Sequence, residues 1–363
     1  MINIDYALDE NSELKDEYFF HWEDFKEDGI NYYYFVGLRS AGKTFDLFKS
    51  MIKYKKCLLI RRTDPELEIM TDEAHNPFIP LIHHDVVKSG YMKRKGKKIY
   101  KIYAGNEGEE EYIGDGVALN TFATTRSADY SYFERIYWDE FIKQPDQKEM
   151  KAEGSAWLAM IQTVARNRNI EVVACANSND IYNPVFKELG VINKLERLMN
   201  DGKEGHKVYT DKERKLKIVL YSPTLELMEY LRRTSLHALT KGTRYADMAY
   251  NNEFIGNDFT DCEYKSIKGY RPMFIIDDYC IWKKKGENLI YMSYALPEGV
   301  KTYYSKYELD QENLRTDWYT YFRNRYLKHR ITFEAYAIKR SFLDIMHLMW
   351  YINYKASTLT HMD

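Results

Sequence analysis

This 363-residue sequence lacks the features typical of membrane, secreted and disulfide-rich proteins. No apolar run comes near the ~18 residues that a membrane-spanning helix needs, so we expect no membrane partner. The first 20 residues are acidic and lack the apolar segment of a secretory signal peptide. The four cysteines are scattered without a CxxC pair. This argues against a zinc ribbon or a disulfide framework and fits a reducing cytoplasm.

A positive net charge is also missing. The chain has 53 lysines and arginines against 55 acidic residues, which gives a formal charge of −2. Proteins that coat nucleic acid through bulk electrostatics are usually basic. A nucleic-acid contact in this chain would therefore need a local basic surface, which suits a grip that is released in every cycle. A composition that is 45% hydrophobic and 30% charged indicates a globular chain of one to three domains.

The order of apolar segments predicts an α/β core. Residues 31–62 run as strand, glycine-rich loop, helix and strand, which indicates a βαβ unit and a parallel sheet. Alternating residues and glycine-rich turns between 91 and 122 predict an inserted antiparallel hairpin. Further buried strands are expected at 133–140, 171–177 and 216–222. Between the first two of these, residues 155–169 show helical periodicity.

The two ends of the chain differ from this core. Residues 1–30 carry ten acidic side chains and several aromatic ones. They predict an acidic amphipathic helix packed on the core, with one aromatic against a nucleotide base as the alternative. A helix is expected at 224–242. Residues 271–297 indicate a long hairpin with KKGEN as its turn, and residues 314–352 read as helical.

Residues 37–44, GLRSAGKT, match the phosphate-loop pattern GxxxxGK[ST] between a predicted strand and a predicted helix. Glycines let the backbone wrap so that successive N–H groups point at phosphate oxygens, with a helix N-terminus behind them. Lys43 is predicted to reach the β- and γ-phosphates of ATP, and the Thr44 hydroxyl to bind Mg²⁺. The predicted nucleotide-binding residues are Gly37, Arg39, Ser40, Ala41, Gly42, Lys43 and Thr44.

Two adjacent acids end the predicted strand FERIYWDE. Burying either charge is costly, so such a pair indicates a task. Asp139 is predicted to hold Mg²⁺, and Glu140 to orient or deprotonate the attacking water. The second acid separates ATP hydrolases from most P-loop kinases. Lys43 and Asp139 are 96 residues apart, which leaves room for the extra strand that such hydrolases place between the two motifs.

Two polar residues near these motifs have open interpretations. Arg39, inside the loop, either contacts a phosphate or a neighbouring subunit, or is a solvated loop arginine. Asn177 ends the predicted strand EVVACAN, where a polar sensor would face the γ-phosphate. Its alternative is an asparagine that caps a strand end.

These motifs together resemble the DNA-packaging ATPases of small phi-29-type tailed phages, relatives of the FtsK–HerA translocases and of terminases. The resemblance covers residues 31–350. It rests on the order and spacing of GLRSAGKT, CLLIRR followed by DPEL, IYWDEF, TVARNRN, ANSNDIYNP and NNEFIGND.

The resemblance implies a homopentameric ring docked on the portal, or connector, of a prohead, with double-stranded DNA as its track. Some members add a structured prohead RNA. Carried over by motif, Arg166 matches the family's trans-acting arginine finger. Arg126 falls where the family has a second basic trans residue, although this match is of charge only. Some members of the family have a lysine thought to contact DNA at the position of Asp64 in this chain. We therefore expect other residues of this chain to contact DNA.

The C-terminal part resembles the family's vestigial RNase H-like module. A two-metal nuclease needs several acids that converge on two ions. Here only Asp277 and Asp278 sit on a candidate first strand, while Asp310, Asp317 and Asp344 have no recognisable spacing. The sequence therefore predicts a domain without nuclease activity.

Two basic stretches are candidate contact surfaces. Residues 93–98, KRKGKK, place five cations in six positions. They form either a solvated hairpin turn or a loop that faces the channel of a ring and grips DNA phosphates. The stretch 323–340 is basic too. It meets RNA, DNA or the portal, or is an ordinary exposed helix face.

We predict an α/β chain with an ASCE P-loop ATPase domain at 1–221, whose sheet is mostly parallel. A small linker domain at 222–255 and an RNase H-like α+β domain at 256–363 follow. The predicted function is ATP-driven translocation of double-stranded DNA into a prohead, by a ring that docks there from the host cytoplasm. Alternatives are a cellular or plasmid DNA-transfer or helicase ATPase, a non-catalytic nucleotide-binding scaffold and a small-molecule kinase. The complete set of Lys43, Thr44, Asp139 and Glu140 argues against the scaffold.

Overall fold

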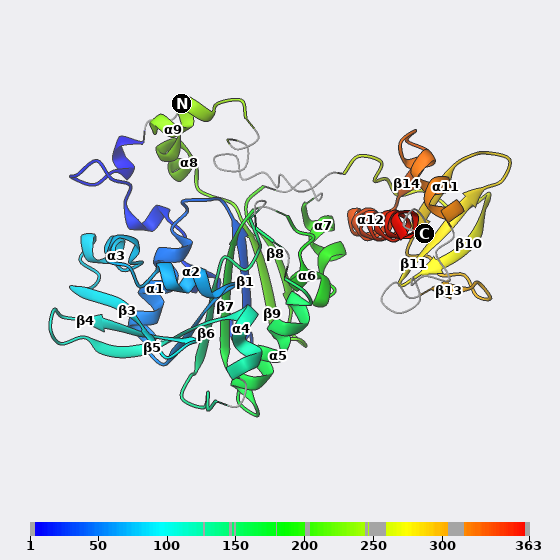
Figure 1. Cartoon of the computed structure of the whole chain (residues 1–363). Helices are drawn as coiled ribbons and strands as arrows, with labels where there is room; N and C mark the ends of the chain where they lie inside the picture. The colour runs from blue at the N-terminus through cyan, green and yellow to red at the C-terminus, as the bar shows by residue number, and fades with distance from the viewer. Residues whose placement is uncertain are drawn as a thin grey trace. The chain divides into compact units, whose positions relative to one another are not determined.

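In the computed structural model, the chain forms two compact units, residues 1–256 and 257–363 (Figure 1). The structure describes residues 4–125, 128–144, 147–148, 150–178, 180–199, 204–243, 246, 259–303 and 316–359. Within these ranges, no helix is long and apolar enough to cross a bilayer.

The first unit is built on a nine-stranded sheet in the order β3-β4-β5-β2-β6-β7-β1-β9-β8. Its strands are β1 (Tyr32–Gly37), β2 (Cys57–Arg61), β3 (Ser89–Lys95), β4 (Ile99–Gly105), β5 (Glu111–Ala118), β6 (Arg135–Asp139), β7 (Glu171–Asn177), β8 (Lys207–Asp211) and β9 (Leu216–Tyr221). The six neighbouring strands from β5 to β9 pair in parallel, and only β3, β4 and β8 run antiparallel to their neighbours. The predicted mixed α/β fold with a mostly parallel sheet is confirmed.

The central strands are almost continuously apolar because helices cover both faces of the sheet (Figure 1). Along β1, Tyr33 and Phe35 join the core beneath helix α1 (Lys43–Tyr54). Tyr34 faces the other way, and its hydroxyl accepts a 2.7 Å hydrogen bond from Trp157 of α5 (Glu153–Ala165). The alternation of side chains along one strand thus divides the core between the two helices.

Strand β7 lies between β1 and β6. An additional strand therefore separates the strands that carry the two motifs, as predicted. This strand does not come from the segment between the motifs in the sequence. The interval from Lys43 to Asp139 contains β2 and the β3–β5 insertion, and β7 follows β6 in the chain. The ends of β1 and β6 are kept one strand apart, which opens a gap above β7.

The remaining helices of this unit are short. They are α2 (Asp64–Ile69), α3 (Ile79–His83), α4 (Leu119–Phe122), α6 (Pro184–Glu188), α7 (Ile192–Met199), α8 (Leu225–Arg232) and α9 (Ser235–Thr240), with 3₁₀ turns at Glu73–His75 and Ala123–Thr125. The single helix expected at 224–242 is wrong. Thr234 starts a new helix by accepting a hydrogen bond from the His237 amide, which divides the segment into α8 and α9.

The N-terminal amphipathic helix is also wrong. Residues 5–25 contain three 3₁₀ turns, η1 (Asp5–Ala7), η2 (Asp16–Tyr18) and η3 (Trp22–Phe25). Several backbone donors of the segment bond to other parts of the chain. The amide of Phe20 donates to the carbonyl of Ala41, and that of Trp22 to the carboxylate of Asp46. These long-range partners replace the local bonds of a helix.

The second unit is a five-stranded sheet with two helices. Its strands are β10 (Tyr270–Ile276), β11 (Tyr279–Lys284), β12 (Ile290–Ser293), β13 (Thr302–Tyr303) and β14 (Ile331–Phe333), in the order β13-β10-β11-β12-β14. Its helices are α11 (Thr316–Tyr326) and α12 (Tyr336–Leu359), so the expected continuous helical stretch is interrupted by β14. The hairpin turn at KKGEN is confirmed by the antiparallel pairing of β11 and β12. The RNase H-like assignment and the two predicted domain boundaries stay predictions.

Asp277 and Asp278 do not lie on a strand, contrary to the prediction. They form the two-residue turn between β10 and β11, where Asp277 has a left-handed φ of 48°. Aspartate tolerates this conformation better than most residues, which explains its place in the turn. In the part of the chain that the structure describes, no three His, Cys, Asp or Glu side chains are placed to hold a metal ion. Asp310 and the side chain of Asp317 lie outside the described residues.

Candidate functional site

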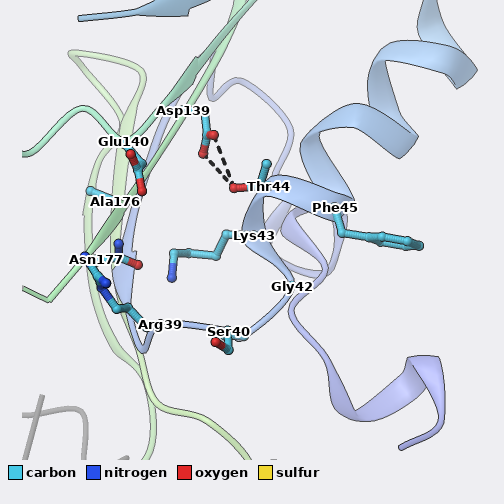
Figure 2. A pocket seen from close by; sticks show the side chains of 11 residues that line it. Arg39, Ser40, Gly42, Lys43, Thr44, Phe45, Asp139, Glu140, Ala176 and Asn177 are labelled. Atoms are coloured by element: carbon cyan, nitrogen blue, oxygen red, sulfur yellow. Dashed lines mark hydrogen bonds between the residues drawn. The ribbon is translucent and has the colours of Figure 1, made fainter. Parts of the chain in front are cut away.

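A cavity of about 400 Å³ opens where β1, β6 and β7 end and α1 begins. The carboxyl ends of parallel strands meet at one edge of a sheet, so residues far apart in the sequence converge there. Figure 2 shows the lining residues, which are Arg39, Ser40, Ala41, Gly42, Lys43, Thr44, Phe45, Asp139, Glu140, Ala176 and Asn177. The cavity thus gathers every described residue predicted for the site except Gly37, at the end of β1, and Arg166.

The loop between β1 and α1 has a backbone that few side chains permit. Gly42 has a φ of 91°, and Ser40 has a left-handed φ of 58°. A Cβ at Gly37 would lie 2.9 Å from the Cβ of Tyr221, so only glycine fits beside that ring. These constraints explain the two glycines of the motif by conformation and close packing.

The Lys43 ammonium is held over the loop that it follows. Its Nζ donates to the carbonyl oxygen of Gly37 at 3.1 Å and to that of Leu38. Burial lowers the pKa of Lys43 to about 8, opposed in part by the carboxylates of Asp139 and Glu140. Burial removes the water that would stabilise the charged form of Lys43. A polyanion bound beside the ammonium would stabilise this charge in place of water.

Thr44 and Asp139 present adjacent oxygen ligands. The Thr44 hydroxyl donates to both oxygens of the Asp139 carboxylate, at 3.1 and 3.2 Å (Figure 2). Asp139 is buried, and burial raises the pKa of its carboxyl group against the opposing effect of Arg61. A hydroxyl and a carboxylate beside an anion cradle are the ligands that Mg²⁺ prefers, so these residues fit that ion.

Arg61, the last residue of β2, is a site residue that the sequence analysis missed. Its guanidinium donates to Asp139 at 2.6 Å and to Glu140 at 2.8 Å. Its Nε also lies 3.4 Å from Glu66. The sequence signal for this role was the arginine at the end of the apolar run CLLIRR, because a buried arginine needs an acidic partner. Which acid it meets depends on the pairing of β2 with β6.

Glu140 turns out of the strand that precedes it. Its φ of 56° lies in the left-handed region, which is uncommon for a residue with a long side chain. This conformation aims the carboxylate into the cavity, where Arg61 holds it. Residues kept in such conformations cluster at functional sites because the surrounding structure must maintain them.

The two residues with open interpretations both line the cavity. Asn177 is the last residue of β7, pairs with Gly37 and is 8% exposed. The Arg39 guanidinium donates to the side-chain oxygen of Gln144 at 2.5 Å, so it is not a freely solvated loop arginine. Whether either contacts a phosphate stays a prediction.

The two arginines of TVARNRN have different surroundings. Arg168 donates to the carbonyls of Tyr130, Ser131, Phe133 and Val164, and so ties the end of α5 to the loop before β6. Arg166 is exposed, is not part of the cavity lining and has an unusual backbone, with φ 50° and ψ −111°. The structural task at this helix end belongs to Arg168. Arg126 lies outside the described residues.

Comparison with known proteins gives consistent results. A model of the family described as Podovirus DNA encapsidation protein (Gp16) matches residues 16–351. The DNA packaging proteins of Bacillus phages PZA and phi29 are each 23% identical over 280 residues, which cover 74% of this chain and 77% of each relative.

Two solved structures share the fold. A chain of the bacteriophage Phi-29 viral genome packaging motor assembly superposes with a TM-score of 0.61 at 18% identity, over 92% of this chain and 99% of that chain. A chain of the Phi-28 gp11 DNA packaging motor superposes with a TM-score of 0.58 at 14% identity, over 93% and 98%.

The double ion pair of Arg61 generates a prediction. Arg61→Ala leaves two adjacent carboxylates without their guanidinium, so we expect the free energy of unfolding to fall by about 3 kcal/mol. Mg²⁺ is expected to restore part of this loss, since it binds carboxylate oxygens. Thermal unfolding in EDTA and in excess Mg²⁺ measures both effects.

Arg61→Lys is the matched control, because lysine keeps the charge but cannot bridge two carboxylates with a planar fork. Its stability should be intermediate. If Mg²⁺ stabilises Arg61→Ala no more than it stabilises the wild type, Arg61 does not balance the acids as described.

Proposed function

This chain belongs to the Podovirus DNA encapsidation protein (Gp16) family, and from that premise we propose that it is an ATP-hydrolysing motor that drives double-stranded DNA into a viral prohead. The observation that carries the proposal is the meeting of Lys43, Thr44, Asp139 and Glu140 at one edge of a parallel sheet. The names of its relatives, DNA packaging proteins, support the choice of DNA as the track.

ATP binding is proposed to begin with the phosphates. The loop of residues 37–42 and the N-terminus of α1 receive them, and Lys43 exchanges its bonds to loop carbonyls for the β- and γ-phosphate oxygens. Thr44 and Asp139 would hold Mg²⁺, which neutralises charge that develops on the phosphates. Asn177 lies at the same edge, where its amide can donate to the γ-phosphate.

Hydrolysis is assigned to Glu140. Its carboxylate points into the cavity and can accept a hydrogen bond from a water molecule that attacks the γ-phosphate. Before that, the carboxylate is held by Arg61 at 2.8 Å. Release of Glu140 from Arg61 would free it to orient the water.

The finger is proposed to come from a neighbouring subunit. Arg166 is exposed and lies outside the lining of its own subunit's cavity, at the end of a helix whose other side is buried. An arginine in that position is available to the site of a neighbouring subunit. This supports a closed ring, which we propose to be a pentamer docked on the portal. A prohead RNA, which the resemblance implies for some members, is a further proposed partner.

DNA contact is proposed for the β3–β4 hairpin. Lys93, Lys95 and Lys97 are exposed near its turn. Arg94 forms ion pairs with Asp64 at 3.2 Å and with Glu68 at 2.7 Å. Asp64 occupies the position at which the resembled family can show a DNA-contacting lysine. Here it pairs with Arg94 of the hairpin instead, so the charge offered to DNA is that of the exposed lysines.

The proposed chemistry predicts separate effects on binding and turnover. Lys43→Ala should lose both ATP binding and ATP turnover. Glu140→Gln should reduce turnover by about 10²-fold or more, because it removes the group that orients the water, while it keeps the phosphate cradle. Phosphate release and equilibrium ATP binding measure the two effects. Turnover near the wild-type rate in Glu140→Gln would remove this residue from its role.

The Arg166 assignment predicts rescue between subunits. Arg166→Ala rings should be inactive, since an arginine finger contributes about 10³–10⁵ in rate. Lys43→Ala rings should be inactive because they do not bind ATP. Mixed rings should recover activity wherever an intact phosphate loop faces an intact finger. Steady-state ATP hydrolysis across mixing ratios is the measurement, with Arg168→Ala as the structural control. Mixed rings that form but recover no activity would exclude action in trans.

The hairpin assignment predicts a loss of DNA affinity without a loss of ATP binding. Replacing Lys93, Lys95 and Lys97 by alanine should weaken duplex binding and lower its salt dependence, because fewer phosphates are neutralised. The same number of exposed lysines elsewhere, Lys187, Lys194 and Lys212, supplies a control with equal net charge. Equal affinity losses in the two triple variants would show a nonspecific charge effect instead.

A further inference from the structure

A second cavity, of about 450 Å³, adjoins the phosphate site. The two cavities share Gly42 and Phe45, at the start of α1. Figure 2 shows Phe45 pointing away from Lys43 and Asp139. The apolar wall of the second cavity is formed by Leu14, Phe19, Phe20, Phe45 and Val86. A molecule held by its phosphates in the first cavity can therefore extend past the start of α1 into the second.

The N-terminal strap, residues 16–25, forms one side of this cavity and is fastened to α1. The Trp22 amide donates to the Asp46 carboxylate at 2.9 Å, and the Trp22 indole donates to Ser50 at 2.7 Å. His21 lies 3.2 Å from the other Asp46 oxygen. The hydrogen bond to Asp46 raises the pKa of His21 to about 9, so this ion pair is present at neutral pH.

The strap places an aromatic ring directly on the phosphate loop. The Phe20 amide donates to the carbonyl of Ala41 at 2.9 Å, which aligns the strap with the loop. A Cβ built at Gly42 would lie 3.3 Å from the Cβ of Phe19. On the other side of the cavity, the Phe45 ring packs edge-on against His84, with ring centroids 5.6 Å apart. The cavity is thus bounded by aromatic side chains from two distant segments.

The charges around the cavity argue against a second phosphate site. Asp9 and Asp16 line it together with three cations, each of which is already bonded within the chain. Lys49 is paired with Asp16 at 2.8 Å, His21 with Asp46 at 3.2 Å, and Lys15 donates to the carbonyl of Tyr6 at 2.8 Å. Carboxylates repel phosphate but accept hydrogen bonds from an exocyclic amino group. Aromatic and aliphatic walls suit a planar ring, which stacks on them irrespective of its edge. The combined chemistry matches the base of an aminopurine.

We propose that this cavity binds the adenine base of the nucleotide whose phosphates occupy the first site, with Phe19 and Phe45 as specificity-determining residues. The inference rests on the proposed function, because it places the phosphates of the same nucleotide on Lys43. It makes the acidic N-terminal strap part of the nucleotide site.

The test separates base recognition from phosphate recognition. ADP, UDP and inorganic tripolyphosphate, each with Mg²⁺, are titrated into the full chain by calorimetry. The wild type should bind ADP more tightly than UDP. Phe19→Ala should weaken ADP binding by about tenfold, as expected for one lost stacking contact, and leave tripolyphosphate binding unchanged. Val86→Trp fills the cavity instead of enlarging it. It should also weaken ADP binding and leave tripolyphosphate binding unchanged.

Phe25→Ala is the matched control, because it removes an aromatic ring from the same strap outside the cavity lining. It should leave the binding of all three ligands unchanged. Equal affinity of the wild type for ADP and UDP would overturn the proposal. So would unchanged ADP binding in folded Phe19→Ala and Val86→Trp, or equal losses for ADP and tripolyphosphate. By contrast, a Lys43→Ala variant that binds tripolyphosphate like the wild type would refute the proposed function itself.

Discussion

The site depends on a balance of opposite charges at one edge of the sheet. Asp139 and Glu140 share a single guanidinium, that of Arg61, and Lys43 lies in the same cavity beside them. Asp139 and Lys43 are buried, whereas the Glu140 side chain is 35% exposed. The two buried charges would be costly without opposite charges beside them. Any ligand that enters must change this balance. A polyanion with its cation would replace protein charges as partners, which links binding to a rearrangement of the acids.

The same strand that supplies Arg61 also fixes the helix that carries Arg166. Arg62 and Glu153 are each 2% exposed and form a two-pronged ion pair, with N–O distances of 2.5 and 2.9 Å. Glu153 is the first residue of α5, so the pair anchors the start of that helix to the end of β2. Breaking a buried pair of this kind typically costs about 3–5 kcal/mol. The start of the helix that ends at Arg166 is therefore fixed to the end of the strand that supplies Arg61.

The N-terminal segment shows why an acidic, aromatic stretch is difficult to interpret alone. Its composition suggested a helix on the core, yet its amides bond to Ala41 and Asp46, which follow in a different part of the chain. Trp22 and Phe20 are buried, as a core-packed helix would also have required. Composition identified the burial, but the partners of the backbone decided the conformation.

The sequence by itself determined the phosphate loop, the acid pair, the central strands and the family resemblance, because each rests on local spacing or continuous apolar runs. It also located nine of the eleven residues that line the cavity, but not Phe45 and Ala176. Only the tertiary structure decided that β7 separates β1 from β6, that Arg61 meets both acids and that Arg39 meets Gln144. Strand order and long-range ion pairs leave no periodic signal in a single sequence, since they depend on which segments pack side by side.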